Sequence, residues 1–501
     1  MPIHDDSLKT DGAFPVESEQ TLDETMEQRK AIQLLLSVME SEEPRHQECD
    51  DYLHGRHPLP YMPKESSAEY KLLAERSVTN MMPLVVQNLV QVLFVEGYGE
   101  GDEKSELWRA WQYNRLDARQ SAIYAGALTY GAAYAVVTPG SAPAGGPIPK
   151  VRGVSARKMA AVYLDPANDE FPIWALEHVY GDRYRLYNDV EILTFSLLGS
   201  RSDTDLKYRV ISTEKHGAPP GVCPVVRFTY ALDLEGRYHG ELEPLMRVQD
   251  RLNQTHMDRL MVQTFGSFKV RTVTGMERPE SKAEADQTKV KMAVDRVLMG
   301  EEEGMKFGSL PETPMAGFIE AGKRDQETLS SMSAVPSHYL TGELNNLGAE
   351  AIAEARASLD AKVDLLKHAF GESNELVFRL MAWHLNRVDD WNDFEAEVVW
   401  KDHQNRSLSQ VADALGKIAS QLGVPVRALW ERIPGVSKTT AAGWEKLLEE
   451  EDLGRILDEM SADGGPDANT GSTDPGAPEG REPGGGSGSE EADEASPVSG
   501  P

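Results

Sequence analysis

Two long helical patterns separated by an insert constrain this chain more than any other feature. The first covers residues 241–264, with Pro244 near its start, and 24 helical residues form a rod of about 36 Å. The second covers residues 313–335 and ends at Val335, because the residue before a proline is disfavoured in a helix. The sequence offers no obvious second layer for these rods. We therefore expect neighbouring copies of the chain to cover their apolar faces.

A polar joint follows the second helical pattern. It covers residues 336–348, ends in Gly348, and contains Glu343, Asn345 and Asn346. A third helical pattern begins at residue 349. Its apolar stripe comprises Ile352, Ala355, Leu359, Val363, Leu366 and Phe370. The glycine and asparagine residues predict a movable joint between two long helices.

The rest of the chain predicts an α+β fold that is mainly helical. Strand patterns dominate residues 151–230, and residues 265–312 mix short strands with one polar helix. A helix over residues 22–43 is expected to stop at Pro44. Further helices are expected over 68–78, after Asn80, from Asp117, and over 407–422, 425–432 and 437–460, with a strand over 395–400.

The chain is strongly acidic. It has 51 Lys and Arg against 82 Asp and Glu, a net charge of −31. Such a surface repels phosphates, which disfavours nucleic-acid binding through a basic patch. Residues 461–501 contain ten Gly and six Pro, and we predict that this acidic tail and residues 1–20 are disordered.

No motif predicts catalysis, and we expect no catalytic residue, no metal site, no cofactor and no enzyme activity. The segment "PGVSKTT" (434–440) lacks the glycines of a phosphate loop, and His54 and His57 lack further ligands at metal-site spacing. Cys49 and Cys223 do not indicate a disulfide framework. We expect neither a signal peptide nor a membrane span, and synthesis in the cytoplasm.

Three arginines recur at multiples of four along the first rod. They are Arg247, Arg251 and Arg259, with Asp250 and Asp258 beside them. One interpretation is a solvated helix face with weak local ion pairs. The other is a polar face that lines a wet passage. The spacing alone favours the first interpretation.

Six segments, in order, resemble the portal proteins of tailed bacteriophages, particularly long-tailed phages of Gram-positive and actinobacterial hosts. They are "YLHG" (52–55), "NLVQVLFVEGY" (88–98), "NRLDARQSAIYAGALTYGAAYAVV" (114–137), "GVCPVVRFTY" (221–230), "GELEPLMRVQDRLNQTHMDRL" (240–260) and "AVPSHYLTGELNNLGAEAIAEA" (334–355). The resemblance covers about residues 30–390. It rests on the order and spacing of the segments rather than on any one of them.

The resemblance implies a portal fold with four parts, assembled as a ring, usually a dodecamer. The parts are a wing (21–240 and 349–404), a stem of two helices (241–264 and 313–335), a clip (265–312) and a crown (405–460). Residues 336–348 become a channel loop, and the three arginines become candidates to face the channel. Glu277 and Arg278 become candidate partner contacts of the clip.

The resemblance also implies where the protein works and with what. The expected location is the virion, at one capsid vertex, where double-stranded DNA passes during packaging and ejection. The expected partners are further copies of the chain, the terminase large subunit, a head-completion adaptor, and the major capsid and scaffold proteins. Two alternatives remain open: another virion structural protein, such as a minor head protein, and a nucleic-acid-processing enzyme whose site is too dispersed to recognise.

Overall fold

The computed structural model describes much of the chain between residues 26 and 448. The described residues are 26–64, 67–99, 106–143, 145–201, 206–266, 271–274, 306–309, 314–342, 349–402, 408–433, 436, 440–441 and 443–448. They belong to two compact units, Met1–Asn405 and Arg406–Pro501. The predicted disorder of residues 1–20 and 461–501 concerns segments outside the described residues. No described helix is long and apolar enough to cross a membrane.

The first helix is longer than its sequence predicts. α1 runs from Met26 to Leu53 with Pro44 inside it, so the predicted stop at Pro44 is wrong. A proline inside a helix removes one hydrogen bond and costs about 3 kcal/mol. Here Cys49 and Tyr52, which follow the proline, are buried. Their burial gives a physical reason for the helix to continue.

Two antiparallel sheets form the β-rich part. The three-stranded sheet has the order β3 (Lys150–Ser155), β2 (Ala133–Thr138), β9 (Val225–Phe228). The second sheet is a five-stranded meander of β4 (Met159–Val162), β5 (Trp174–Tyr180), β6 (Arg183–Tyr187), β7 (Glu191–Leu197) and β8 (Tyr208–Lys215). The strand patterns predicted over residues 151–230 are thereby confirmed. The early half of α1 packs on the meander through Ile32, Leu35 and Leu36 against Leu176 and Phe195.

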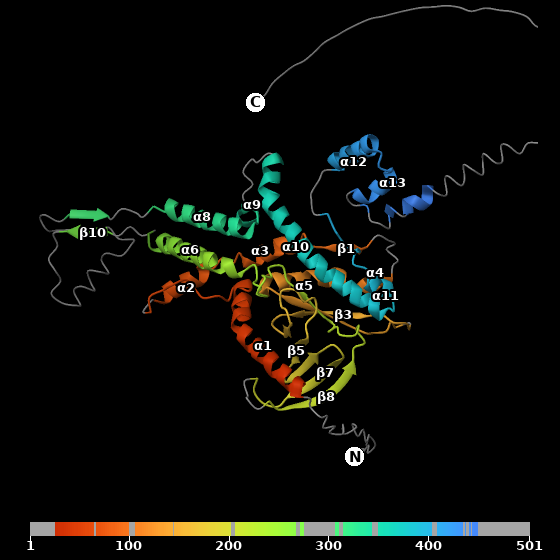
Figure 1. The fold of residues 1–501 in the computed structure, drawn as a ribbon. Coiled ribbons are helices and arrows are strands. Elements are labelled where there is room, and N and C mark those ends of the chain that lie inside the picture. Colours follow the sequence, from red (N-terminus) through yellow and green to blue (C-terminus); the bar gives the residue numbers. More distant parts are fainter. Residues whose placement is uncertain are drawn as a thin grey trace, which may run out of the picture. The chain divides into compact units, whose positions relative to one another are not determined.

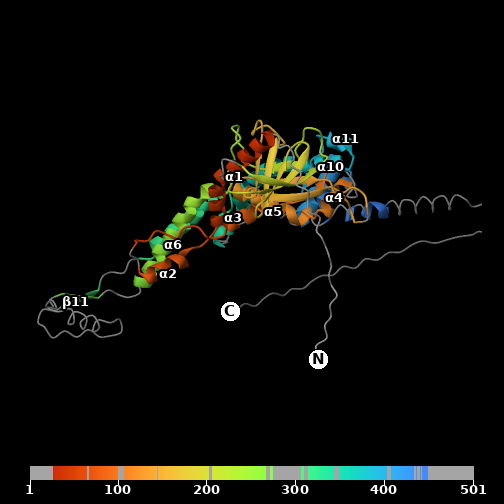
Figure 2. The same ribbon diagram turned by 90° about the horizontal axis from the view of Figure 1, so that it is seen from below.

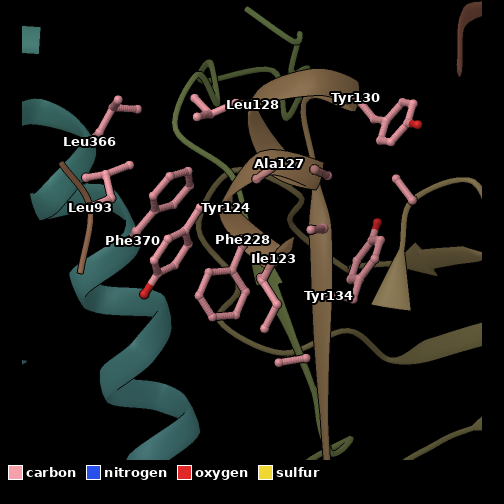
Figure 3. Close-up of a cluster of buried hydrophobic side chains, with 14 of the residues drawn as sticks. Leu93, Ile123, Tyr124, Ala127, Leu128, Tyr130, Tyr134, Phe228, Leu366 and Phe370 are labelled. Atoms are coloured by element: carbon pink, nitrogen blue, oxygen red, sulfur yellow. The ribbon is translucent and has the colours of Figure 1, made fainter. Parts of the chain in front are cut away.

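The main core lies between α5 (Leu116–Tyr130), the three-stranded sheet and α10 (Ala349–His384). Figure 3 shows Tyr124 of α5 beside Phe370 of α10 and Phe228 of β9. The Tyr124 and Phe370 rings stack with centroids 5.1 Å apart, and Asn374 donates to the Tyr124 hydroxyl at 2.9 Å. The apolar stripe predicted for the third helix faces this core: Leu359, Val363, Leu366 and Phe370 are buried.

Smaller elements complete the first unit. α2 (Ala68–Ser77), α3 (Met82–Val90) and β1 (Val95–Tyr98) follow the predicted order, and β1 pairs with β12 (Val398–Trp400). α4 (Glu106–Tyr113) was not predicted, and α11 spans Val388–Trp391. Gly131 ends α5 with φ 85°, and a Cβ there would lie 2.8 Å from the His239 carbonyl carbon. The predicted break at Gly131 therefore has a steric reason.

The two predicted rods are present and lie side by side (Figure 1). A short 3-10 helix, η1 (Glu243–Leu245), leads into α6 (Met246–Gly266), and α8 covers Ala316–Ser333. Within the insert, β10 (Arg271–Thr274) pairs antiparallel with β11 (Lys306–Ser309). Figure 2 shows α6 and α2 extending away from the sheets.

The first part of the joint after α8 contains a short helix. Ala334 ends α8 with φ 59°, and a short helix, α9, follows over Ser337–Thr341. Val335, Pro336 and Leu340 are buried. The first half of the joint is therefore packed structure rather than a polar loop. Residues 343–348 lie outside the described residues.

The second unit is helical in its described part. It contains α12 (Leu408–Leu422), α13 (Val426–Leu429) and η2 (Trp430–Arg432). These elements agree with the helices predicted over 407–422 and 425–432. The Trp430 and Trp444 rings meet edge to face at 5.9 Å.

Candidate functional site

The helix pair α6/α8 and its attachment to the sheets form the candidate site. The helices are antiparallel, because Arg251 contacts Asp325 whereas His256, further along α6, faces Gly322, which precedes Asp325 on α8. Arg251 Nε donates to Asp325 Oδ1 at 2.6 Å, and Thr255 Oγ1 donates to Asp325 Oδ2 at 2.9 Å. Both oxygens of this buried carboxylate are thus bonded to α6. The pair is fixed by polar contacts as well as by apolar packing.

The opposite side of α6 forms hydrogen bonds with the backbone of the segment before α3. Gln249 Oε1 accepts from the Met81 amide at 3.0 Å, and Gln249 Nε2 donates to the Thr79 carbonyl at 2.8 Å. Asn253 Oδ1 accepts from the Thr79 amide at 3.0 Å. Both amide side chains are buried. They satisfy backbone groups that would otherwise be buried without partners.

α6 is therefore covered on two sides within one chain. α2 and the segment before α3 pack on one side, and α8 packs on another. The expectation that only neighbouring copies could cover these rods is wrong for α6. The sequence did not reveal that α2 packs on α6, because α2 lies about 180 residues before α6.

His57 extends this attachment. Asn253 Nδ2 donates to His57 Nε2 at 2.7 Å, so the proton of a neutral ring is on Nδ1, which has no hydrogen-bond partner in the described part of the chain. The His57 ring stacks on Tyr52 with centroids 4.7 Å apart, and the Tyr52 hydroxyl donates to Asp250 Oδ1 at 2.7 Å. Burial lowers the pKa of His57, which favours the neutral ring that this contact needs.

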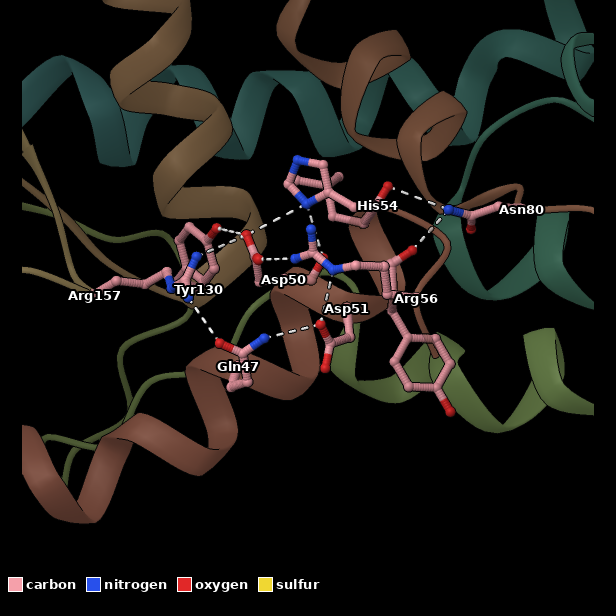
Figure 4. Close-up of polar contacts among 10 residues, drawn as sticks. Gln47, Asp50, Asp51, His54, Arg56, Asn80, Tyr130 and Arg157 are labelled. Atoms are coloured by element: carbon pink, nitrogen blue, oxygen red, sulfur yellow. Dashed lines mark hydrogen bonds and ion pairs between the residues drawn. The ribbon is translucent and has the colours of Figure 1, made fainter. Parts of the chain in front are cut away.

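A second polar cluster joins the end of α1 to α5 (Figure 4). Asp50 is its centre: Asp50 accepts a hydrogen bond from Tyr130 at 2.8 Å and pairs with Arg157 at 3.0 Å and with Arg56. Burial raises the pKa of the Asp50 carboxyl, but the Tyr130 hydrogen bond and the nearby positive charges outweigh it and hold the pKa below its ordinary value. Asn80 donates to the Tyr52 carbonyl at 2.8 Å, which ties the end of α1 to the segment before α3.

A third contact set closes the sheet end of the helix pair. Lys362 of α10 pairs with Glu241, and its Nζ donates to the Ser333 carbonyl at the end of α8 at 3.0 Å. Tyr230 donates to Glu241 Oε2 at 2.6 Å. Glu241 is only 3% exposed. One lysine thus joins α10 to both α8 and the start of the α6 segment.

The predicted site residues fall into three groups. The side chains of Arg247 and Arg251 are 87% and 54% exposed. They lie on one strip of the α6 surface, called the open stripe here, which also includes Asp258. Arg259 lies roughly 80° round the helix from Arg251, and its Nε is buried without a hydrogen-bond partner among the described residues. The spacing therefore brings two of the three arginines together. Glu277 and Arg278 of the insert, and Glu343, Asn345 and Asn346 of the joint, lie outside the described residues.

The described residues offer no centre for metal or thiol chemistry. They contain no group of three or more His, Cys, Asp and Glu side chains that could hold a metal ion. A cavity of about 190 Å³ lies between α1 and the start of α6, lined by Arg45, Glu48, Cys49, Glu243, Met246 and Arg247. Burial raises the pKa of the Cys49 thiol to about 12, so this thiol stays protonated and is a poor nucleophile.

Sequence reasoning missed the residues that hold the helix pair in place. These are Glu241, Gln249, Asn253, Asp325 and Lys362. The one local signal is the spacing of four between Gln249 and Asn253, which places two amides on one helix face. The other contacts join residues far apart in the sequence, and no spacing reveals them.

Comparisons with known proteins give one family and several solved structures. The family model described as "Phage portal protein, SPP1 Gp6-like" matches residues 33–461. No curated protein matches the chain. Similar solved structures include a chain in a "Virion of native gene transfer agent (GTA) particle", 12% identical, with TM-score 0.39, 73% of this chain covered and 92% of that one. Another is in a "Neck of native GTA particle computed with C12 symmetry", 14% identical, with TM-score 0.39 and coverage of 74% and 88%.

Proposed function

The chain belongs to the phage portal protein family, and on that premise we propose that it forms the ring through which double-stranded DNA enters and leaves the capsid. The observation that carries the proposal is the antiparallel pair α6/α8 with a 49-residue insertion between the two helices, residues 267–315. In this proposal residues 241–264 and 313–335, which include most of α6 and all of α8, are the stem and residues 265–312 are the clip. The working location is the virion, at one capsid vertex.

The ring is the part of the proposal that can be tested first. We expect purified protein to form a closed ring of about twelve copies with an axial hole, seen by electron microscopy and by mass photometry. A chain that remains at 55.3 kDa at every salt concentration, with and without scaffold protein, would contradict the ring.

The stem supplies two features that suit a conduit. Arg251 is bonded to Asp325, which leaves less of its charge free for DNA, and Asp258 lies on the same open stripe of α6. The net charge of −31 on every copy further reduces adhesion to phosphates. In the proposed ring, Arg247 and Arg251 face the channel at stem level.

The clip is the proposed docking site for the terminase large subunit and afterwards for the head-completion adaptor. Glu277 and Arg278 are its candidate contact residues. The proposal assigns no reaction to this chain, because the portal family is structural rather than enzymatic. Terminase would supply the energy for packaging, and capsid and scaffold proteins would surround the ring.

The proposed channel loop predicts a specific packaging defect. Replacing Asn345 and Asn346 with lysine is expected to slow or stall packaging, because a ring of cations would hold the DNA backbone. Each phosphate contact steepens the salt dependence, with a slope of log K against log salt of about −0.9 per contact, so packaging should partly recover at higher salt. Asn345→Gln with Asn346→Gln is the matched neutral control. Assembled lysine rings that package at the control rate would contradict the channel assignment.

Two other functions remain distinguishable by experiment. A minor head protein would not form a closed ring, and the helix–insertion–helix arrangement favours the portal role over it. A nucleic-acid-processing enzyme would show nuclease or ATPase activity in the purified chain, and this activity should be measured beside ring assembly.

A further inference from the structure

An extended apolar segment lies along the side of α6. It covers residues 58–63, with the sequence PLPYMP, and is called the strap here. Leu59 is 43% exposed and Tyr61 is 81% exposed, whereas Pro60 between them is buried. This alternation is that of an extended chain, with one residue directed inward and its two neighbours outward.

The strap is held to α6 at two points. His57, directly before it, bonds Asn253 at 2.7 Å, and the Tyr61 amide donates to Gln254 Oε1 at 2.9 Å. Three prolines fix φ along the strap, so little backbone freedom remains to be lost on binding. The exposed Leu59 and Tyr61 side chains are therefore held ready for contact.

The strap and α8 flank the open stripe of α6. A helix advances about 100° per residue, so the order round α6 is Gln254, Arg247, Asp258, Arg251 and Thr255. Gln254 bonds the strap, whereas Arg251 and Thr255 bond α8. The strap therefore borders one edge of the open stripe, and α8 borders the other edge. A subunit that faces an axis with this stripe presents the strap to one neighbour and α8 to the next.

The start of α8 has an exposed, mainly uncharged surface at a similar position along the α6 axis. Ile319 is 56% exposed, and Ala316, Gly317 and Ala321 near it are also exposed. Because His256 faces Gly322, Ile319 lies near residue 259 of α6, which is within about 8 Å of Gln254 along the helix axis.

The lack of charge on the strap favours a second copy of the chain as its partner. Copies that each carry −31 repel one another, and this repulsion opposes association least where neither contact surface is charged. The strap contains no charged residue, and the six residues that begin α8 contain one, Glu320. Two different patches on two flanks give a head-to-tail contact, which closes into a ring when the rotation between neighbouring copies divides a full turn, whereas one self-complementary patch gives only a dimer.

We propose that the strap of one subunit packs against α8 of the next subunit, beside Ile319, and so closes the ring. This inference rests on the ring proposed above. It identifies a surface outside the two stem helices as half of the subunit contact.

Charge substitution tests the strap. Tyr61→Asp is expected to convert the ring to a 55.3 kDa monomer in mass photometry, with an unchanged circular dichroism spectrum because Tyr61 is 81% exposed. Tyr180→Asp is the matched control, since Tyr180 is 60% exposed at the end of β5, and its rings should persist. Rings that withstand Tyr61→Asp would overturn the strap contact and leave the ring itself intact. A wild-type monomer would overturn both.

Cross-linking tests the partner surface. Tyr61→Cys and Ile319→Cys chains, mixed and treated with a short bis-maleimide, are expected to give covalent dimers, and neither chain alone should do so. A chain carrying both substitutions should give a ladder of oligomers. Both native cysteines are buried, and the wild-type chain is the control. Dimers from one variant alone, or none from the mixture while rings are present, would overturn the head-to-tail contact.

Discussion

Replacing Lys362 with alanine is expected to lower the free energy of unfolding by about 3–5 kcal/mol. The substitution leaves the Glu241 carboxylate buried, with the Tyr230 hydroxyl as its remaining side-chain partner among the described residues. It also removes the donor to the Ser333 carbonyl. Urea unfolding at one protein concentration measures the loss.

Arg324→Ala provides the matched control for Lys362→Ala. Arg324 forms an exposed pair with Glu320 on α8, 3.6 Å apart, and such a pair contributes about 0–1 kcal/mol. The double variant Lys362→Met with Glu241→Gln should recover part of the loss, because no charge is then left buried. If Lys362→Ala unfolds at the same urea concentration as Arg324→Ala, the buried pair does not hold the helix pair α6/α8 to α10.

Acid is expected to destabilise the fold between about pH 6.5 and pH 4. Burial lowers the pKa of His46 to about 4, assisted by the charge of Arg45, and burial with the nearby His216 lowers that of His384 to about 4. Both rings stay neutral in the folded chain while the unfolded chain takes up protons below pH 6.5. As the pH is lowered through this window, the free energy of unfolding therefore decreases, by about 1–3 kcal/mol for each histidine.

Urea unfolding at several pH values between 7 and 4.5 measures this effect. His46→Gln with His384→Gln should flatten the pH profile relative to the wild-type chain, whatever it does to stability at pH 7. An unchanged slope in the double variant would show that other groups cause the acid sensitivity.

Hydrophobic periodicity predicted the elements whose apolar faces are buried. The stripe through Leu359, Val363 and Phe370 was read from spacing alone, and these residues are in the core. The same reasoning failed at Pro44, because a local rule cannot weigh the burial of residues such as Cys49 and Tyr52, which comes from elements far along the chain.

The candidate site was predicted less completely than the fold. Arg247 and Arg251 were identified from their spacing, but Arg251 is bonded to Asp325, a residue 74 positions away. Lys362 and Glu241 are 121 positions apart. Contacts of this kind depend on which surfaces meet in three dimensions, and a single sequence contains no local record of them.

The length of α10 gives Lys362 a mechanical meaning. Ala349, where the chain arrives from residues 343–348, is about 20 Å from Lys362 along the helix, and His384 is about 33 Å away on the other side. The part of α10 beyond Lys362 is held in place, because Leu366, Phe370, Val377 and Met381 are buried in the main core and Trp383 donates to the Gly217 carbonyl at 2.9 Å. A force applied at Ala349 would therefore meet its first fixed points at Leu359 and Lys362, about 15–20 Å along the helix, and be passed by Lys362 to the end of α8.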